Sequence, residues 1–255
     1  MTLYLNKKNG NKYSSPSQKI RVMSEQWTKE NIFCPRCGNG TINKVKNNKP
    51  VFDFICPKCK SVYELKSKKR NIGKKVVDGA YDTMITRITS YNNPDFFFMS
   101  YNSYDFKVKD FIFIPKHFFT PEIIEKRKPL SETASRAGWV GCNIILKDIP
   151  EDGRIYIIRD GLTVKQNIVK KKVKRTSFLQ DAKIVKRRWI IDILNCINRI
   201  DKKEFSLAEM YSFEEELSKK YSENKHVKDK IRQQLQLLRD KNYIKFLGRG
   251  KYKKG

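Results

Sequence analysis

The chain has 255 residues, of which 55 are Lys or Arg and 27 are Asp or Glu, so its net charge is +28. This length fits one large domain or two ordinary ones, and a hydrophobic content of 39% excludes a disordered chain. So large a positive charge requires a polyanionic partner, which makes nucleic acid the first expectation and a membrane surface a distant second. No secretory leader and no run of about 18 apolar residues is visible, so we expect a cytoplasmic protein that does not enter a membrane.

The first helix is expected over residues 15–30, where Ile20, Met23 and Trp27 follow one another at helical spacing. A second amphipathic helix is expected from the apolar residues Val77, Tyr81, Met84, Ile85 and Ile88. Three stretches rich in aromatic and β-branched residues have the composition of buried strands: residues 95–101, 111–114 and 155–158. This order of elements predicts an α/β domain with a central mixed sheet.

Two Cys-x-x-Cys knuckles, separated by 18 residues, lie between the first helix and the strands. Their members are Cys34 with Cys37, and Cys56 with Cys59. Four thiolates at this spacing complete a tetrahedron around zinc and leave no open position, which predicts a structural Zn²⁺ site. A reduced thiol cluster and an iron site of rubredoxin type are the alternatives. We expect a positive φ at Gly38, and Cys142 and Cys196 as small buried apolar residues.

Three polar residues around the second knuckle suggest a catalytic centre. Residues 62–67 alternate like a strand, so Glu64 and Lys66 point to the same side, and Asp53 reaches them if residues 52–54 form the adjacent strand. Two carboxylates can hold Mg²⁺ through oxygen ligands. The lysine can orient or deprotonate the attacking water and stabilise charge on a phosphate. From the pattern alone, a solvated strand face is the more common explanation.

Residues 164–183 interrupt this composition with a run of basic residues, which fits either a solvated linker or a surface that contacts phosphates. A helical face follows, made of Trp189, Ile190, Ile193, Leu194 and Ile197. Ser206 and Glu209 have the spacing of a capping box for a helix that runs to about residue 220. A third helix is indicated by Val227, Ile231, Leu235 and Leu238. The glycine-containing segment 243–253 then reads as a hairpin, so the C-terminal part is expected to be a winged helix.

The third C-terminal helix carries an outer row of polar and basic residues. These are Lys228, Arg232, Gln233, Gln236 and Arg239. We expect its first turn, with Lys225 and His226, to enter the major groove, where Gln pairs with adenine and Arg with guanine. Arg249, Lys251 and Lys253 of the hairpin are expected to contact phosphates. The solvated face of an ordinary basic helix is the alternative.

Trp139 lies between glycines in the segment Ala137-Gly138-Trp139-Val140-Gly141. Such an indole fits an exposed loop that meets a base edge, and a core tryptophan with glycines at its turns is the alternative. Arg136, just before it, is a candidate for contact with a phosphate or a base. Trp27 and Trp189 are expected to be core residues.

The segment from Asp53 to Glu64-Leu65-Lys66 resembles the motif of PD-(D/E)XK nucleases, although Pro50 stands three residues before the aspartate instead of beside it. Beyond the motif, the chain from about residue 15 to its end resembles the DpnI-like family of methyl-directed (type IIM) restriction endonucleases. The stretches that carry this resemblance are CPRCGN, ELKSKK, DGAY, NNPDFFF, RAGWVGCNI, ILNCI, HVKDKIRQQLQLLRDK and FLGRGKYKK.

The resemblance implies a PD-(D/E)XK catalytic domain with an inserted four-Cys zinc element over residues 1–182, and a small winged-helix domain over 183–255. It implies cleavage of double-stranded DNA at GATC sites that carry N6-methyladenine, with Asp53, Glu64 and Lys66 at the catalytic positions and the Leu65 carbonyl available to Mg²⁺. It also implies that the loop around Trp139 senses the methyl group. We expect a monomer. A DNA-binding regulator without activity, and a nuclease with another site preference, remain alternatives.

Overall fold

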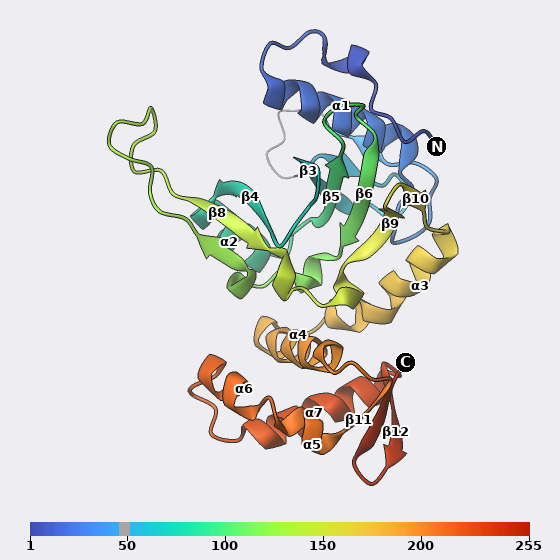
Figure 1. The fold of residues 1–255 in the computed structure, drawn as a ribbon, viewed down its shortest axis with the longest axis vertical. Helices are drawn as coiled ribbons and strands as arrows, with labels where there is room; N and C mark the ends of the chain where they lie inside the picture. The colour runs from blue at the N-terminus through green and yellow to red at the C-terminus, as the bar shows by residue number, and fades with distance from the viewer. Residues whose placement is uncertain (46–51) are drawn as a thin grey trace. The chain divides into compact units, whose positions relative to one another are not determined.

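The computed structural model describes residues 1–45 and 52–255, which form two compact units, residues 1–177 and residues 178–255 (Figure 1). Pro50 of the expected nuclease motif lies outside the described residues. The domain boundary expected after residue 182 remains a prediction. Within the described ranges, no helix has the length and hydropathy that a bilayer-crossing span requires.

A mixed sheet forms the centre of the first unit, as the sequence predicts. Its strands, in spatial order, are β1 (Asn43–Lys44), β2 (Phe54–Ile55), β3 (Val62–Lys69), β5 (Asp95–Tyr101), β6 (Val108–Ile114), β9 (Ile155–Arg159) and β10 (Leu162–Thr163). The long β3 and β5 are parallel, and the other neighbouring strands are antiparallel. The expected strands over 95–101, 111–114 and 155–158 are therefore confirmed. They pair through backbone hydrogen bonds, and their side chains alternate between the two faces of the sheet.

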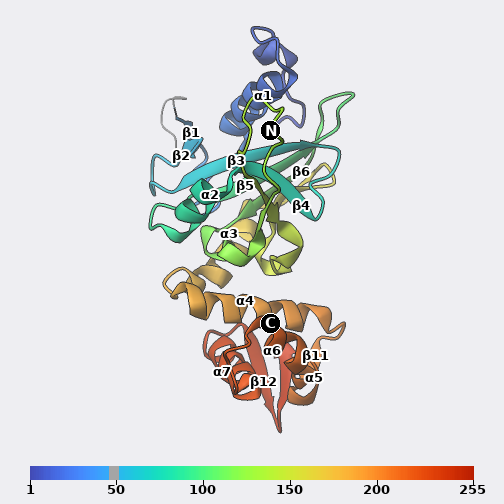
Figure 2. The ribbon, with the colours of Figure 1, turned by 90° about the vertical axis from the view of Figure 1, so that its left-hand side faces the viewer.

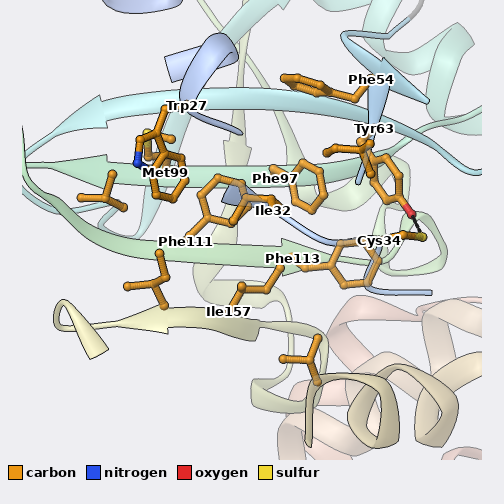
Figure 3. Packing of buried hydrophobic residues seen from close by; sticks show 14 of the residues in the cluster. Trp27, Ile32, Cys34, Phe54, Tyr63, Phe97, Met99, Phe111, Phe113 and Ile157 are labelled. Carbon is orange, nitrogen blue, oxygen red and sulfur yellow. Dashed lines mark hydrogen bonds between the residues drawn. The ribbon is translucent and has the colours of Figure 1, made fainter. Parts of the chain in front are cut away.

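Both faces of this sheet are covered, which explains why every residue of β5 is buried. On one face, Phe97 and Phe111 pack with Trp27 from α1 (Pro16–Asn31) in the main apolar cluster (Figure 3). On the other face, the ring of Phe96 stacks on Phe119 at 4.3 Å between centroids. Each fully buried aromatic side chain of this kind stabilises the fold by about 1.5–3 kcal/mol. The expected helix over residues 15–30 and the core position of Trp27 are both confirmed.

The second expected helix begins later than predicted. Residues Lys75–Ala80 form strand β4, and only Tyr81–Thr89 form helix α2. Val77 lies opposite Asn143 in a second sheet of order β4-β8-β7, and its side chain is 62% exposed. The other two strands of that sheet are β8 (Gly141–Ile145) and β7 (Ile124–Lys126). Val77 has helical spacing to Tyr81, but a strand 66 residues further along the chain supplies its hydrogen bonds.

Residues 164–177 are not a solvated linker. Gln166–Thr176 form helix α3, which buries Val169 and Val173 in the main apolar cluster of the first unit. Short 3-10 turns complete the connections: Lys7–Gly10, Lys116–Phe118, Pro121–Ile123, Leu146–Asp148, Glu151–Gly153 and Ser177–Leu179. The linker alternative for the basic run is therefore wrong, because two valines at helical spacing give α3 an anchored face.

The second unit has the helices and hairpin of a winged helix. Its elements are α4 (Ile184–Arg199), β11 (Glu204–Ser206), α5 (Leu207–Tyr211), α6 (Glu214–Lys220), α7 (Val227–Asp240), β12 (Ile244–Gly248) and β13 (Lys251–Lys254). The hairpin β12–β13 projects from the side of this unit opposite α4 (Figure 2). Trp189 is 3% exposed, so its predicted core position is confirmed.

The capping box at Ser206 is present: its hydroxyl accepts from the Glu209 amide at 3.1 Å, and the Glu209 carboxylate accepts from the Ser206 amide at 2.7 Å. The helix that it starts ends after five residues, at Tyr211, and α6 continues the path. The prediction of one helix up to residue 220 is therefore wrong in this detail. Strand β11, which Ser206 terminates, pairs with β13 and joins the start of α5 to the hairpin.

We predict that Ser206→Ala destabilises the second unit by about 1 kcal/mol, because the α5 amides lose their cap. Hydrogen–deuterium exchange of the full chain should show faster exchange of the α5 amides and unchanged exchange in β3 and β5. Ser222→Ala, at an exposed position outside the helices, is the matched control. Equal exchange in the two variants would contradict the role of the cap.

Candidate functional site

The two Cys-x-x-Cys knuckles have the same backbone conformation. In the first, the Gly38 amide donates to the Cys34 carbonyl at 2.8 Å, and in the second the Lys60 amide donates to the Cys56 carbonyl at 3.0 Å. Gly38 has a φ of 79°, as expected, and Lys60 occupies the equivalent left-handed position with a φ of 60°. Each knuckle therefore turns tightly enough to direct two sulfurs at one point.

The four knuckle sulfurs converge within 4.8 Å of one another. The Cys34 and Cys59 sulfurs lie 3.5 Å apart, and those of Cys37 and Cys56 lie 3.6 Å apart. Sulfurs bound tetrahedrally to zinc at about 2.3 Å are separated by about 3.8 Å, so this donor set fits zinc. The four cysteines thus form a metal-binding cluster, and the chemistry of four thiolates indicates Zn²⁺. Cys142 and Cys196 lie outside the cluster and are buried, as predicted.

The second knuckle is the turn that joins β2 to β3, as the order of residues predicts. Asp53 stands immediately before β2, and its amide donates to the Tyr63 carbonyl at 2.9 Å. The Tyr63 hydroxyl lies 2.8 Å from the Cys34 sulfur, and Figure 3 shows this contact as a dashed line. Tyr63 precedes Glu64, so the metal cluster and the strand that carries Glu64 share a direct contact.

Asp53 and Glu64 are brought together by this hairpin. The Leu65 amide donates to the Asp53 carboxylate at 2.8 Å. The amide and carbonyl of one residue in an extended strand project to the same edge, so the Leu65 carbonyl also points toward the side of Asp53. Two carboxylates and one carbonyl are the hard oxygen donors that Mg²⁺ prefers, so the donor set fits this ion.

A row of alternating charges extends from Glu64. The Lys66 ammonium lies 2.6 Å from Glu64 Oε1 and also pairs with Asp78 of β4, while Arg87 Nη1 of α2 lies 2.5 Å from Glu64 Oε2. None of these four side chains is more than 20% exposed. Apart from the ion pair with Arg87, the buried Glu64 Oε2 accepts no hydrogen bond from the described residues. As a carboxylate oxygen it belongs to the class of donor that binds hard cations.

The surroundings shift the proton affinities of two members of the site. Burial raises the pKa of Asp53, an effect that the hydrogen bond from the Leu65 amide opposes and that the negative charges of Glu64 and Glu25 reinforce. Burial alone would lower the pKa of Lys66, but the carboxylates of Glu64 and Asp78 outweigh it, so that the pKa is raised. Lys66 is therefore a cation at neutral pH.

Glu25 of α1 is a further buried carboxylate near Asp53. It is 3% exposed and forms ion pairs with Arg21 Nε at 2.6 Å and with Lys44 Nζ at 2.7 Å. Its negative charge raises the pKa of Asp53, as noted above. The two cations compensate the buried charge of Glu25 and connect α1 to β1 at the edge of the sheet.

Trp139 lies in an arm that connects β7 to β8 and projects from the second sheet (Figure 1). The arm is closed by paired amides: Leu130 N donates to the Trp139 carbonyl at 2.9 Å, and Gly138 N donates to the Leu130 carbonyl at 3.1 Å. The Arg136 guanidinium lies 4.9 Å from the centre of the Trp139 ring. A Cβ on Gly141 would lie 2.8 Å from this ring, so the indole covers its own strand and does not enter the core.

The residues expected to meet DNA in the second unit lie on α7 and the hairpin. Those with exposed side chains are Lys225, His226, Lys228, Arg232, Gln233, Gln236, Arg239, Arg249 and Lys251. Three of the expected contact residues form ion pairs within the chain: Lys228 with Glu214 at 3.1 Å, Arg239 with Asp240 at 2.9 Å, and Lys253 with Glu204 at 3.3 Å. Gln234, between two expected base-reading positions, faces inward and is 1% exposed. The structure therefore presents an exposed basic helix beside a basic hairpin.

Two family models together match nearly the whole chain. The first is the DpnI model, described as the Dam-replacing family, and it matches residues 1–182. The second is described as the Dam-replacing HTH domain, and it matches residues 185–254. The chain belongs to the Dam-replacing family. Membership in the Dam-replacing family makes it a nuclease of the methylation-dependent restriction class, with a C-terminal DNA-binding domain and DNA as its partner. Membership in this nuclease family also indicates a divalent metal ion as cofactor.

Three side chains of this Dam-replacing family member were not expected at the site: Glu25, Asp78 and Arg87. Asp78 lies in the DGAY stretch that contributes to the resemblance, but nothing in its spacing from Lys66 predicts their ion pair. Arg87 is one residue among many cations, and Glu25 lies on a helix that otherwise packs into the core. Only the tertiary structure, through the pairing of β4 with β8 and the packing of α1 and α2, brings these groups close to β2 and β3.

We predict that the purified chain carries one equivalent of zinc, because four convergent thiolates close the coordination shell. Cys37→Ser should lower the zinc content measured by elemental analysis, and a chelator should lower the melting temperature of the native protein. Cys196→Ser, at a buried cysteine of the second unit, should retain full zinc content. A zinc-free wild type that melts as the native protein does would contradict a structural role for the cluster.

Proposed function

We propose that this chain is a Mg²⁺-dependent type II restriction endonuclease with a PD-(D/E)XK core, which cleaves double-stranded DNA at GATC sites containing N6-methyladenine. The observation that carries the proposal is the position of Asp53, just before β2 and bonded to the Leu65 amide, beside Glu64 on the paired strand β3, with Lys66 on the same side as Glu64. Membership in the Dam-replacing family supports the dependence on methylation. We further propose a cytoplasmic monomer.

In this mechanism, Asp53, Glu64 and the Leu65 carbonyl hold the metal. Bound Mg²⁺ supplies a Lewis acid that activates water and neutralises charge on the scissile phosphate. The Lys66 ammonium faces the same region and stabilises negative charge that develops on the phosphate oxygens. Asp78 fixes the direction of the Lys66 side chain through their ion pair. Arg87 balances the negative charge of Glu64 through their ion pair.

Methylated DNA is read, in this proposal, from both units. Trp139 and Arg136 of the arm approach the methylated base edge from the catalytic unit. In the second unit α7 enters the major groove, where Gln233 and Gln236 meet adenine and Arg232 meets guanine. Lys225 and His226 precede that helix, and the exposed cations Lys228, Arg249 and Lys251 contact phosphates.

The assay that tests this function uses plasmid from an adenine-methylating host and from a host without the methylase, each incubated with the protein and Mg²⁺. We expect fragments with ends at GATC from the methylated plasmid alone. A protein that binds but cuts neither plasmid is a DNA-binding regulator and defeats the proposed function. Cutting of the unmethylated plasmid alone would assign the chain a different site preference.

We predict that Asp53→Asn lowers the cleavage rate by roughly three orders of magnitude or more, because an amide cannot supply the anionic oxygen that the metal requires. Asparagine keeps the shape of the side chain and an oxygen for the Leu65 amide, so binding of methylated DNA measured without Mg²⁺ should be retained. Loss of binding together with cleavage would instead assign Asp53 to the fold.

We predict that Asp78→Asn lowers kcat by about 10- to 100-fold and leaves KM unchanged, since Lys66 loses the group that orients it. Asp78 raises the pKa of Lys66, so the variant should lose its rate at lower pH than the wild type on the alkaline side of the profile. Asp82→Asn, at an exposed carboxylate of α2, is the control. An alkaline limb that does not move would refute the positioning role.

A further inference from the structure

Helix α3 carries a cluster of like charges that the catalytic strands do not use. Four lysines occur within five positions, Lys170, Lys171, Lys172 and Lys174, and all four are exposed. Within the described part of the chain none of them forms a salt bridge, whereas Arg175 at the end of the helix lies 4.0 Å from Asp152. Like charges one turn apart repel each other and destabilise a helix, so this surface costs the free protein stability.

The structure holds α3 firmly enough to keep this cluster in place. Val169 and Val173 are buried in the main apolar cluster of the first unit. At its first turn, the Gln166 amide nitrogen donates to the Gly38 carbonyl of the first knuckle at 2.5 Å, and the Lys170 stem lies against Gly38. The metal cluster therefore supports one end of α3, and the helix turns a fixed basic face to solvent.

We infer that the outward face of α3 is a surface for the DNA backbone, which binds phosphates without reading sequence. At 100° per residue, Lys171 and Lys174 point away from the stripe of Val169 and Val173. These cations span about 5 Å of helix axis, a distance over which duplex DNA presents about three phosphate charges. The inference rests on the proposed action on double-stranded DNA.

The distribution of apolar residues favours DNA over an anionic membrane surface. A helix that lies in a membrane interface exposes an apolar stripe opposite its charges. In α3 that stripe is buried against the sheet, and Ile168 is the helix residue among the exposed large hydrophobic side chains. The exposed face of α3 therefore offers a partner mainly positive charge, which is what contacts to phosphates require.

The test compares Lys171→Gln/Lys174→Gln with Lys12→Gln/Lys29→Gln in the full chain. Lys12 and Lys29 are also exposed, and both lie outside α3. Both variants lose two positive charges, so any difference in their DNA binding must come from where on the protein those charges lie. Binding is measured by fluorescence anisotropy over a range of NaCl concentrations without Mg²⁺, on duplexes with and without a methylated GATC site.

For the α3 variant we expect the slope of log K against log salt to become shallower by about 2, because each lost phosphate contact contributes about 0.9. Affinity for both duplexes should fall several-fold, and their ratio should stay constant. Thermal melting and the single-turnover cleavage rate at saturating enzyme should equal those of the wild type.

Two results would overturn the inference. One is an α3 variant whose salt slope equals that of the control. The other is unchanged DNA binding together with loss of binding to phosphatidylserine vesicles, which would assign α3 to a membrane. The proposed function fails separately: if the wild type cuts no methylated plasmid but the slopes still differ, the surface is established and the endonuclease activity is not.

Discussion

The hydrogen bond from the Leu65 amide to the Asp53 carboxylate is the contact on which the geometry of the proposed catalytic site depends. It exists because the second Cys-x-x-Cys knuckle turns the chain from β2 into β3. If that turn opened, the buried Asp53 would lose its donor, and the two carboxylates would no longer face one metal. The four-cysteine cluster and the proposed catalytic metal site are thus linked through a single short hairpin.

The metal cluster also connects elements that are distant in the sequence. Cys34 contacts the hydroxyl of Tyr63 on β3, and the carbonyl of Gly38 accepts a hydrogen bond from Gln166 on α3. The neighbouring Arg36 forms a buried ion pair with Asp95 at the start of β5. Three parts of the first unit are therefore fixed relative to one small loop. The four-cysteine cluster therefore helps to position β3, the strand that carries Glu64 and Lys66 of the proposed catalytic site.

Charge is distributed differently at the catalytic strand and over the rest of the surface. Around Glu64 and Lys66, acids and bases alternate and are mostly buried, which limits the cost of desolvating each one. On α3, α7 and the hairpin, cations are exposed, and many of them have no acidic partner among the residues that the structure describes. The first pattern suits a site that must hold a metal and a phosphate in fixed positions. The second suits a surface that neutralises a long polyanion.

The sequence by itself determined the features that depend on local spacing: the paired knuckles, α1, the buried strands, the capping box and the C-terminal helices with their hairpin. Cys-x-x-Cys spacing and helical periodicity are short-range properties of the chain. Only the tertiary structure decided that Val77 belongs to a strand, that the basic run forms a packed helix, and that Asp78, Arg87 and Glu25 surround the catalytic strand. These outcomes depend on partners many residues away, and side-chain pairing across such separations leaves no periodic trace in the sequence.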